Sequence, residues 1–460
     1  MKVKRLKMTS FRGISDLTLD FQTEEPNVLI GINGVGKSSI LDCLAIVFCP
    51  LIELIRLNPD YYKFLERKSI VPSFTWLDIK NGCNNIRTEI TISGDGFPEV
   101  SWSIITTYQE RHIETNVDII QLKAFSENIH NQLKINPNAT VPLVVYYPVN
   151  RAVLDIRLEL PNQHPLTGIL DEETDDEGDL QPQFPSLSAK RVIYPVDVID
   201  QIDAYAQALT EKQIGYVRFF QWFRTLEDVE NEERRDNPDY RDRQLEAVRQ
   251  AISSLMPGFS NLRVRRSPLR MTAKKQGQEL IVNQLSDGEK GLLAMVGDLA
   301  RRLAIANPGL PNPLQGEGVV LIDEIELHLH PKWQREIIPA LTRTFPNCQF
   351  IVTTHSPQVI SEVKPNGIYI LEATSEGVVA KRPESSYGRD SNRILEDLMG
   401  VPARPQEFKD DLLELFRLID KGDLDGARQL RQQIADEIGA DEPELVKASV
   451  SIRRKEILSR

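Results

Sequence analysis

Eight residues near the N-terminus have the spacing of a phosphate-binding loop. The run Gly31-Ile32-Asn33-Gly34-Val35-Gly36-Lys37-Ser38 fits G-x-x-x-x-G-K-[ST]. The glycines let backbone N–H groups turn inward on phosphates, and the helix start that follows adds its positive dipole end. Lys37 would reach the β- and γ-phosphates, and Ser38 would hold Mg²⁺. The sequence therefore predicts an ATP site, with contacts from Asn33, Gly34, Gly36, Lys37, Ser38 and Ser39.

Two carboxylates follow an apolar run in the second half of the chain. Val319-Val320-Leu321-Ile322 is typical of a buried strand, and Asp323 and Glu324 come directly after it. Carboxylates at the C-terminal end of a parallel strand lie at the ligand-binding edge of the sheet. We expect Asp323 to hold Mg²⁺ through water and Glu324 to polarise the attacking water. The alternative is an acidic strand end that only caps the next helix.

A histidine ends the next predicted strand, Gln349 to Thr354. A lone histidine after a strand is usually structural. His355, however, follows the carboxylate strand by one helix, which is the position of a γ-phosphate sensor in this layout. We expect it to act in catalysis beside Glu324.

A second anion site is predicted where Leu285-Ser286-Asp287-Gly288-Glu289-Lys290 opens a helix. The structural alternative is a capping box, in which the Ser286 side chain caps the helix and the Glu289 side chain, three residues later, bonds to the Ser286 amide. The functional interpretation has Ser286, the Gly288 amide and the helix start binding a phosphate. Because a helical segment separates this site from Lys37, it would serve the γ-phosphate of a partner's ATP.

Alternating elements must position these residues. Strands and helices alternate after Leu280, which predicts a mostly parallel sheet with helices on both faces. The predicted elements are helix 287–305, strand 318–322, helix 331–345, strand 349–354, helix 357–363 and strand 368–371. Earlier in the chain, the patterns predict strands at 3–10, 17–21, 28–30, 86–105 and 141–147 and a helix at 38–48.

Four segments result. They are an N-terminal ATPase lobe (1–150), an acidic loop and helical lid insertion (151–270), a C-terminal ATPase lobe (271–382) and a helical tail for partner or oligomer contacts (383–460). The run 171–179 is predicted to be a solvated acidic loop. Residues 199–256 are predicted to be helical, with their aromatic side chains more typical of packing than of base stacking.

Composition narrows the class of protein. The chain has 460 residues and a net charge of −12, which argues against a general nucleic-acid coat. No membrane-spanning run of about 18 apolar residues is expected, and the basic start lacks the apolar region of a signal peptide. The four cysteines are expected to be buried free thiols in a reducing cytoplasm.

The order of loop, Ser-x-Gly helix start, Asp-Glu pair and histidine resembles the ABC ATPase superfamily. Ser10-Phe11-Arg12-Gly13 and the run from Asp323 to Pro331 resemble its SMC, Rad50, RecF and OLD branch. This resemblance implies an α/β fold with a mixed β lobe, a parallel sheet flanked by helices, a short helical lid and a helical extension. It also implies that Arg12 reaches the nucleotide and that His328 and His330 have seam or packing roles.

Within the branch, the layout is similar to the PtuA family of Septu and retron-associated anti-phage systems. Tyr146 to Arg151, Leu285 to Leu303 and Tyr387 to Leu395 carry this likeness. The resemblance implies a homodimer or higher even oligomer that holds a separate HNH-type nuclease. Asn150 is the candidate for the missing magnesium-binding glutamine. No nuclease site is expected in the chain itself, because its last hundred residues lack a strand with a D-x-D pair.

A basic run leaves an alternative open. Arg263, Arg265, Arg266, Arg270, Lys274 and Lys275 could track a phosphate backbone, as in a DNA-maintenance ATPase that binds duplex ends. An edge strand protected by charge explains the run equally well.

Overall fold

The computed structural model describes residues 1–57, 59, 74–94, 97–109, 112–149, 201–210, 216–375 and 377–458. The chain divides into two compact units, Met1–Gly388 and Arg389–Arg460. The acidic run 171–179 and Asn150 lie outside the described residues.

The first unit contains a six-stranded sheet among its described residues. Its order is β14-β13-β3-β12-β11-β7, with β14 antiparallel to β13 and the other strands parallel. β3, β11 and β12 are buried along their whole length, which explains their continuous apolar runs. The strands are β3 Asn27–Ile30, β7 Leu143–Tyr147, β11 Gly318–Ile322, β12 Cys348–Thr353, β13 Ile368–Thr374 and β14 Gly377–Lys381.

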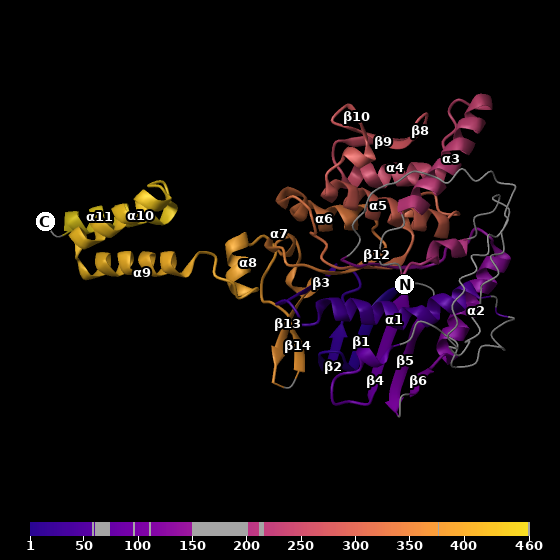
Figure 1. The fold of residues 1–460 in the computed structure, drawn as a ribbon, viewed down its shortest axis with the longest axis horizontal. Helices are drawn as coiled ribbons and strands as arrows, with labels where there is room; N and C mark the ends of the chain where they lie inside the picture. The colour runs from indigo at the N-terminus through magenta and orange to yellow at the C-terminus, as the bar shows by residue number, and fades with distance from the viewer. Residues whose placement is uncertain are drawn as a thin grey trace, which may run out of the picture. The chain divides into compact units, whose positions relative to one another are not determined.

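A second, antiparallel sheet has the order β2-β1-β4-β5-β6. Helix α1, Lys37–Arg56, lies between the two sheets (Figure 1) and contacts strands of both. The Trp102 indole of β5 donates to the Val47 carbonyl of α1 at 2.9 Å. The strands are β1 Lys2–Phe11, β2 Ile14–Asp20, β4 Asn85–Gly94, β5 Phe97–Gln109 and β6 His112–Val117.

Helix α1 corrects one expectation. It is long and apolar enough to cross a membrane by length and composition, although no such run was expected. Most of it is buried inside the protein, as in the core helix of an α/β fold. Helix α2, Ile120–Ile135, and the edge strands β6 and β14 were not predicted at all.

Where the structure describes the predicted lid, its α-helices are α3 Tyr216–Asp236 and α4 Arg243–Leu255. Phe219, Phe220 and Phe223 of α3 are fully buried, so the packing role of the aromatic cluster is confirmed. The three-stranded sheet β10-β9-β8 follows, with β8 Phe259–Arg266, β9 Leu269–Lys275 and β10 Gln278–Ile281. Helices α5 Asp287–Ala306, α6 Pro331–Thr344 and α7 Pro357–Ile360 then flank the parallel sheet.

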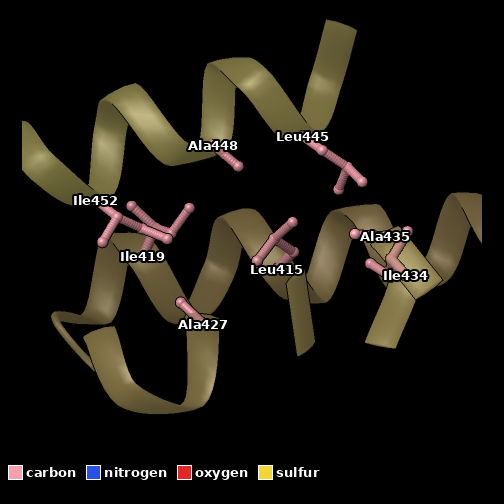
Figure 2. Close-up of a cluster of buried hydrophobic side chains, with 8 residues drawn as sticks. All are labelled: Leu415, Ile419, Ala427, Ile434, Ala435, Leu445, Ala448 and Ile452. Carbon is pink, nitrogen blue, oxygen red and sulfur yellow. The ribbon is translucent and has the colours of Figure 1, made fainter. Parts of the chain in front are cut away.

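The second unit is helical, as predicted for the tail. It contains α8 Ser391–Asp397, α9 Gln406–Lys421, α10 Leu424–Ile438 and α11 Pro443–Leu458. Figure 2 shows its core, where aliphatic side chains of α9, α10 and α11 meet.

The four cysteines are free thiols. Burial raises the pKa of the Cys49 and Cys348 thiols to about 12, and it raises the pKa of the Cys43 thiol further. Cys83 is exposed, so the expectation of four buried thiols is wrong for this residue.

Candidate nucleotide site

The predicted phosphate loop connects β3 to α1. Gly36 lies directly before α1 with φ 111°, a left-handed conformation that glycine adopts at little cost. Among the described residues, no side chain caps this helix start, and its first turn contains no acidic residue. The N–H groups at the start of α1 are therefore available to a phosphate.

Lys37 folds back over the loop. Its Nζ donates to the carbonyl oxygens of Gly31, at 2.9 Å, and Ile32, at 3.0 Å. Burial lowers the pKa of Lys37, while the negative charges of Asp323, Glu324 and Glu326 act against this shift. The lysine from one end of the sequence and the carboxylates from the other therefore lie within electrostatic reach of each other.

The two carboxylates follow β11 and are fixed by the neighbouring strands. The Asp323 amide donates to the Tyr147 carbonyl of β7 at 2.9 Å. On the other side, the Thr353 hydroxyl of β12 donates to Asp323 Oδ1 at 2.5 Å and accepts from the Glu324 amide at 2.7 Å. Glu324 has φ 45°, which is uncommon for a residue other than glycine. Thr353, which was not predicted from the sequence, thus links the carboxylate of Asp323 to the backbone of Glu324.

A third carboxylate holds the segment that carries His355. Glu326 accepts from the His355 amide at 2.5 Å and from the Thr354 hydroxyl at 2.7 Å. Both bonds fix the backbone from which the imidazole projects. The position of Glu326, two residues after the Asp-Glu pair, was the available sequence signal.

Arg12 is directed at carboxylates. Its Nε donates to Asp78 Oδ1 at 2.9 Å, and one of its terminal nitrogens donates to Asp42 Oδ2 at 2.5 Å. Asp42, five residues after Lys37 in α1, also accepts from the Tyr146 hydroxyl at 2.9 Å. This places Arg12 against the phosphate-loop helix. Its predicted contact with the nucleotide stays a prediction.

The start of α5 contains the capping box that the sequence allowed. The Ser286 hydroxyl accepts from the Glu289 amide at 3.4 Å, and Glu289 Oε2 accepts from the Ser286 amide at 3.1 Å. Burial acts to raise the pKa of Glu289, but bonds from Lys275 and Ser286 outweigh it, so the pKa is lowered. A Cβ on Gly288 would lie 2.2 Å from the His328 carbonyl oxygen. Only glycine fits there, so the predicted second anion site packs directly against the segment that follows the carboxylates.

Helix α5 is anchored further along by a buried ionic cluster. Asp298 accepts from Arg301 at 2.7 Å, from Arg302 at 2.6 Å and from the Tyr147 hydroxyl at 3.0 Å. Burial acts to raise the pKa of Asp298, but the two arginines hold it well below its ordinary value. Tyr147 therefore contacts α5 through its hydroxyl and the Asp323 amide through its carbonyl.

Most of the basic residues from Arg263 to Lys275 form ion pairs with acidic residues of the same chain. Arg263 and Arg265 both pair with Glu279, at 3.2 and 2.8 Å. Arg266 pairs with Glu227 and Asp228, and Lys275 pairs with Glu289. These pairs favour the charge-protected edge strand over a DNA-binding face.

Two protein-family models match the chain. One, described as "AAA domain", matches residues 5–257, and another, described as "AAA domain, putative AbiEii toxin, Type IV TA system", matches residues 193–361. Among solved structures, the SMC head domain from Thermotoga maritima covers 84% of this chain and 100% of its own, with 14% identity and a TM-score of 0.41.

Curated relatives span nearly the whole chain. It is 30% identical to the retron Ec83 probable ATPase of Escherichia coli over 99% of this chain and 87% of that protein. It is 29% identical to the retron Vc95 probable ATPase of Vibrio cholerae over 91% and 82%. A shorter match, 32% identical over 130 residues, covers 27% of this chain and 33% of the Septu protein PtuA of Bacillus thuringiensis.

Proposed function

We propose that this chain, which belongs to the AAA-domain family of the retron Ec83 probable ATPase, binds and hydrolyses ATP as a switch in an anti-phage defence complex. The expected relationship to the retron and Septu PtuA proteins is confirmed by these relatives. One observation carries the proposal: the chain places Lys37, with the Asp323 and Glu324 carboxylates acting on its pKa, at the carboxyl edge of a parallel sheet.

The residues present fit ATP and Mg²⁺. Loop amides and Lys37 would hold the phosphates. The Ser38 hydroxyl and the Asp323 carboxylate are hard oxygen donors of the kind that Mg²⁺ prefers. ATP supplies the phosphoanhydride bond. Glu324 would accept a proton from water, and the Glu326-held His355 segment would position an imidazole at the γ-phosphate.

We propose further that each site is completed by a second copy of the chain. In the described structure, Ser286 and Glu289 bond to each other, Glu289 also pairs with Lys275, and Asp287 pairs with Lys290. None of these bonds reaches a residue of the phosphate loop. The start of α5 would therefore contact the γ-phosphate of an ATP molecule bound by the partner. This is the role that the sequence predicts for the Ser286-Asp287-Gly288 helix start.

Mixing two variants tests the composite site. Lys37→Ala removes the loop lysine and leaves Ser286 intact, and Ser286→Arg does the reverse. Each alone should be inactive, although Ser286→Arg should still bind ATP. A mixed dimer keeps one intact site, so an equal mixture should recover at most about one quarter of wild-type turnover. Normal hydrolysis by Ser286→Arg alone would contradict composite sites.

The effector is proposed to be a separate nuclease, held by an oligomer of this chain. The PtuA and retron relatives support a defence role, and the chain carries ATPase motifs. Purification with the product of the adjacent gene, with ATP, ADP or no nucleotide, tests the partnership. If no complex forms in any of these states, the switch role is wrong even where ATP hydrolysis is intact.

A further inference from the structure

The last helix of the second unit is apolar on two sides. One side faces the core: Leu445, Ala448 and Ile452 are buried and point toward the neighbouring helices (Figure 2). At about 100° per residue, these three positions lie within an arc of about 60°. Packing in this unit therefore uses one face of α11.

The opposite side of α11 carries a second stripe of aliphatic residues. Val446, Val450 and Ile457 have exposed fractions of 49%, 64% and 67%. Their spacings of four and seven residues place them within an arc of about 40°, centred about 150° from the core-facing residues. Scattered single exposed aliphatics are normal, but three aligned on one helix face form a stripe.

Basic residues border this stripe. Lys447 and Arg454 lie along one flank, and Arg453 lies along the other. Arg453 and Arg454 are exposed and form no ion pair with the described part of the chain. Lys447 has a 4.0 Å contact with Glu444, the geometry of a weak surface pair. The stripe is thus apolar along its centre and positive along both sides.

We propose that Val446, Val450 and Ile457, with Lys447, Arg453 and Arg454, form a docking surface for a partner protein with an apolar centre and an acidic rim. The proposal rests on the proposed function only in assuming that the chain acts through a partner. Charge complementarity selects this occupant. Pairing with a second copy through this stripe would bring the basic residues of the two copies together.

Photo-cross-linking in the full chain tests the surface. Val450→p-benzoylphenylalanine is expressed in the native host, irradiated and analysed by mass spectrometry. We expect one predominant cross-linked protein, joined through a peptide rich in Asp and Glu. The yield should fall at least tenfold when Arg453→Glu and Arg454→Glu are added. Leu413→p-benzoylphenylalanine on α9, where Leu413 is 63% exposed, is the matched control and should not capture this protein.

Other products overturn the proposal. A cross-link to a second copy, to lipid, or to a peptide without acidic residues would contradict it. So would the absence of any product, or a cross-linking yield that the Arg→Glu changes leave unaltered. ATP turnover of the same variants is the separate readout. Turnover should equal that of the wild type, because no residue of the stripe belongs to the phosphate loop, the Asp-Glu segment or the start of α5. Loss of cross-linking with normal turnover removes this inference alone, and absence of turnover in the wild type removes the proposed function alone.

Discussion

The starts of α1 and α5 are both candidate phosphate sites, and they differ in what already satisfies them. Gly36 precedes α1 with no side-chain cap among the described residues, and the first turn of α1 has no acidic residue. Helix α5 is capped by Ser286 and Glu289, with Asp287 also in its first turn. An uncapped helix N-terminus attracts an anion by itself, whereas a helix N-terminus with its own acidic side chains attracts a bound anion less strongly. We therefore expect α1 to bind ATP alone and α5 to engage only when a second copy presents a phosphate.

Removing the catalytic carboxylate gives the largest expected effect. Glu324→Gln keeps the shape of the side chain but cannot accept a proton, so turnover should fall by roughly 10²- to 10⁴-fold. The variant should keep its affinity for ATP. Bound ATP should then join the α1 start of one protomer to the α5 start of its partner, and the resulting dimer should be detected by sedimentation. Adding Ser286→Arg should abolish that dimer. Glu336→Gln, an exposed carboxylate on α6, serves as control, and near-normal turnover of Glu324→Gln would exclude the assigned role.

Lys37→Ala tests whether α1 binds on its own. Loss of a charged donor should weaken ATP binding by at least about 100-fold, because hydrogen bonds to charged groups contribute about 1.5–3 kcal/mol each. Titration calorimetry measures the affinity, with Lys332→Ala on α6 as control. If Lys37→Ala binds ATP as wild type does, the contrast between the two helix starts fails.

Asp298→Asn tests the anchor that holds α5 in place. The change leaves Arg302 buried beside a neutral group, so the free energy of unfolding should fall by about 3–5 kcal/mol. The pKa of Asp298 is lowered in the folded state, so its contribution is full above the unfolded value of about 4 and is lost as pH falls. Denaturant unfolding at pH 7 and pH 3 measures this. The wild type should approach the variant at low pH, and Asp287→Asn, on the exposed end of the same helix, should change little.

Removing the Glu289 side chain from the capping box of α5 gives the smallest expected effect. Glu289→Ala removes half of the capping box, which should lower the free energy of unfolding by about 1 kcal/mol. ATP affinity of the isolated chain should not change, because α1 alone binds it. A fall in that affinity would show that α5 contributes within a single copy.

The sequence was most informative where chemistry requires particular residues at a fixed spacing. The strand before Asp323 was predicted, and the capping box at Ser286 was the structural alternative that the sequence offered, because each depends on a few neighbouring residues. The roles proposed for Lys37, Glu324 and His355 remain predictions that the variants above test.

Contacts between distant segments could not be predicted. Thr353 bridges Asp323 and Glu324 only because β12 pairs with β11 in one register, which a single sequence does not reveal. Asp298 looks like an ordinary helix-surface residue until Tyr147 is placed beside it. The edge strands β6 and β14 were missed because short edge strands depend on their neighbours more than on their own pattern.

The uneven exposure of the four thiols has a practical consequence. Three are enclosed and hard to ionise, which leaves Cys83 as a natural attachment point for a maleimide dye without any prior cysteine replacement. Its amide is bonded to Lys80, whose own amide is bonded to Ser10, two residues before Arg12. A fluorophore at Cys83 would therefore report in real time on rearrangement of the Arg12 segment as nucleotide arrives.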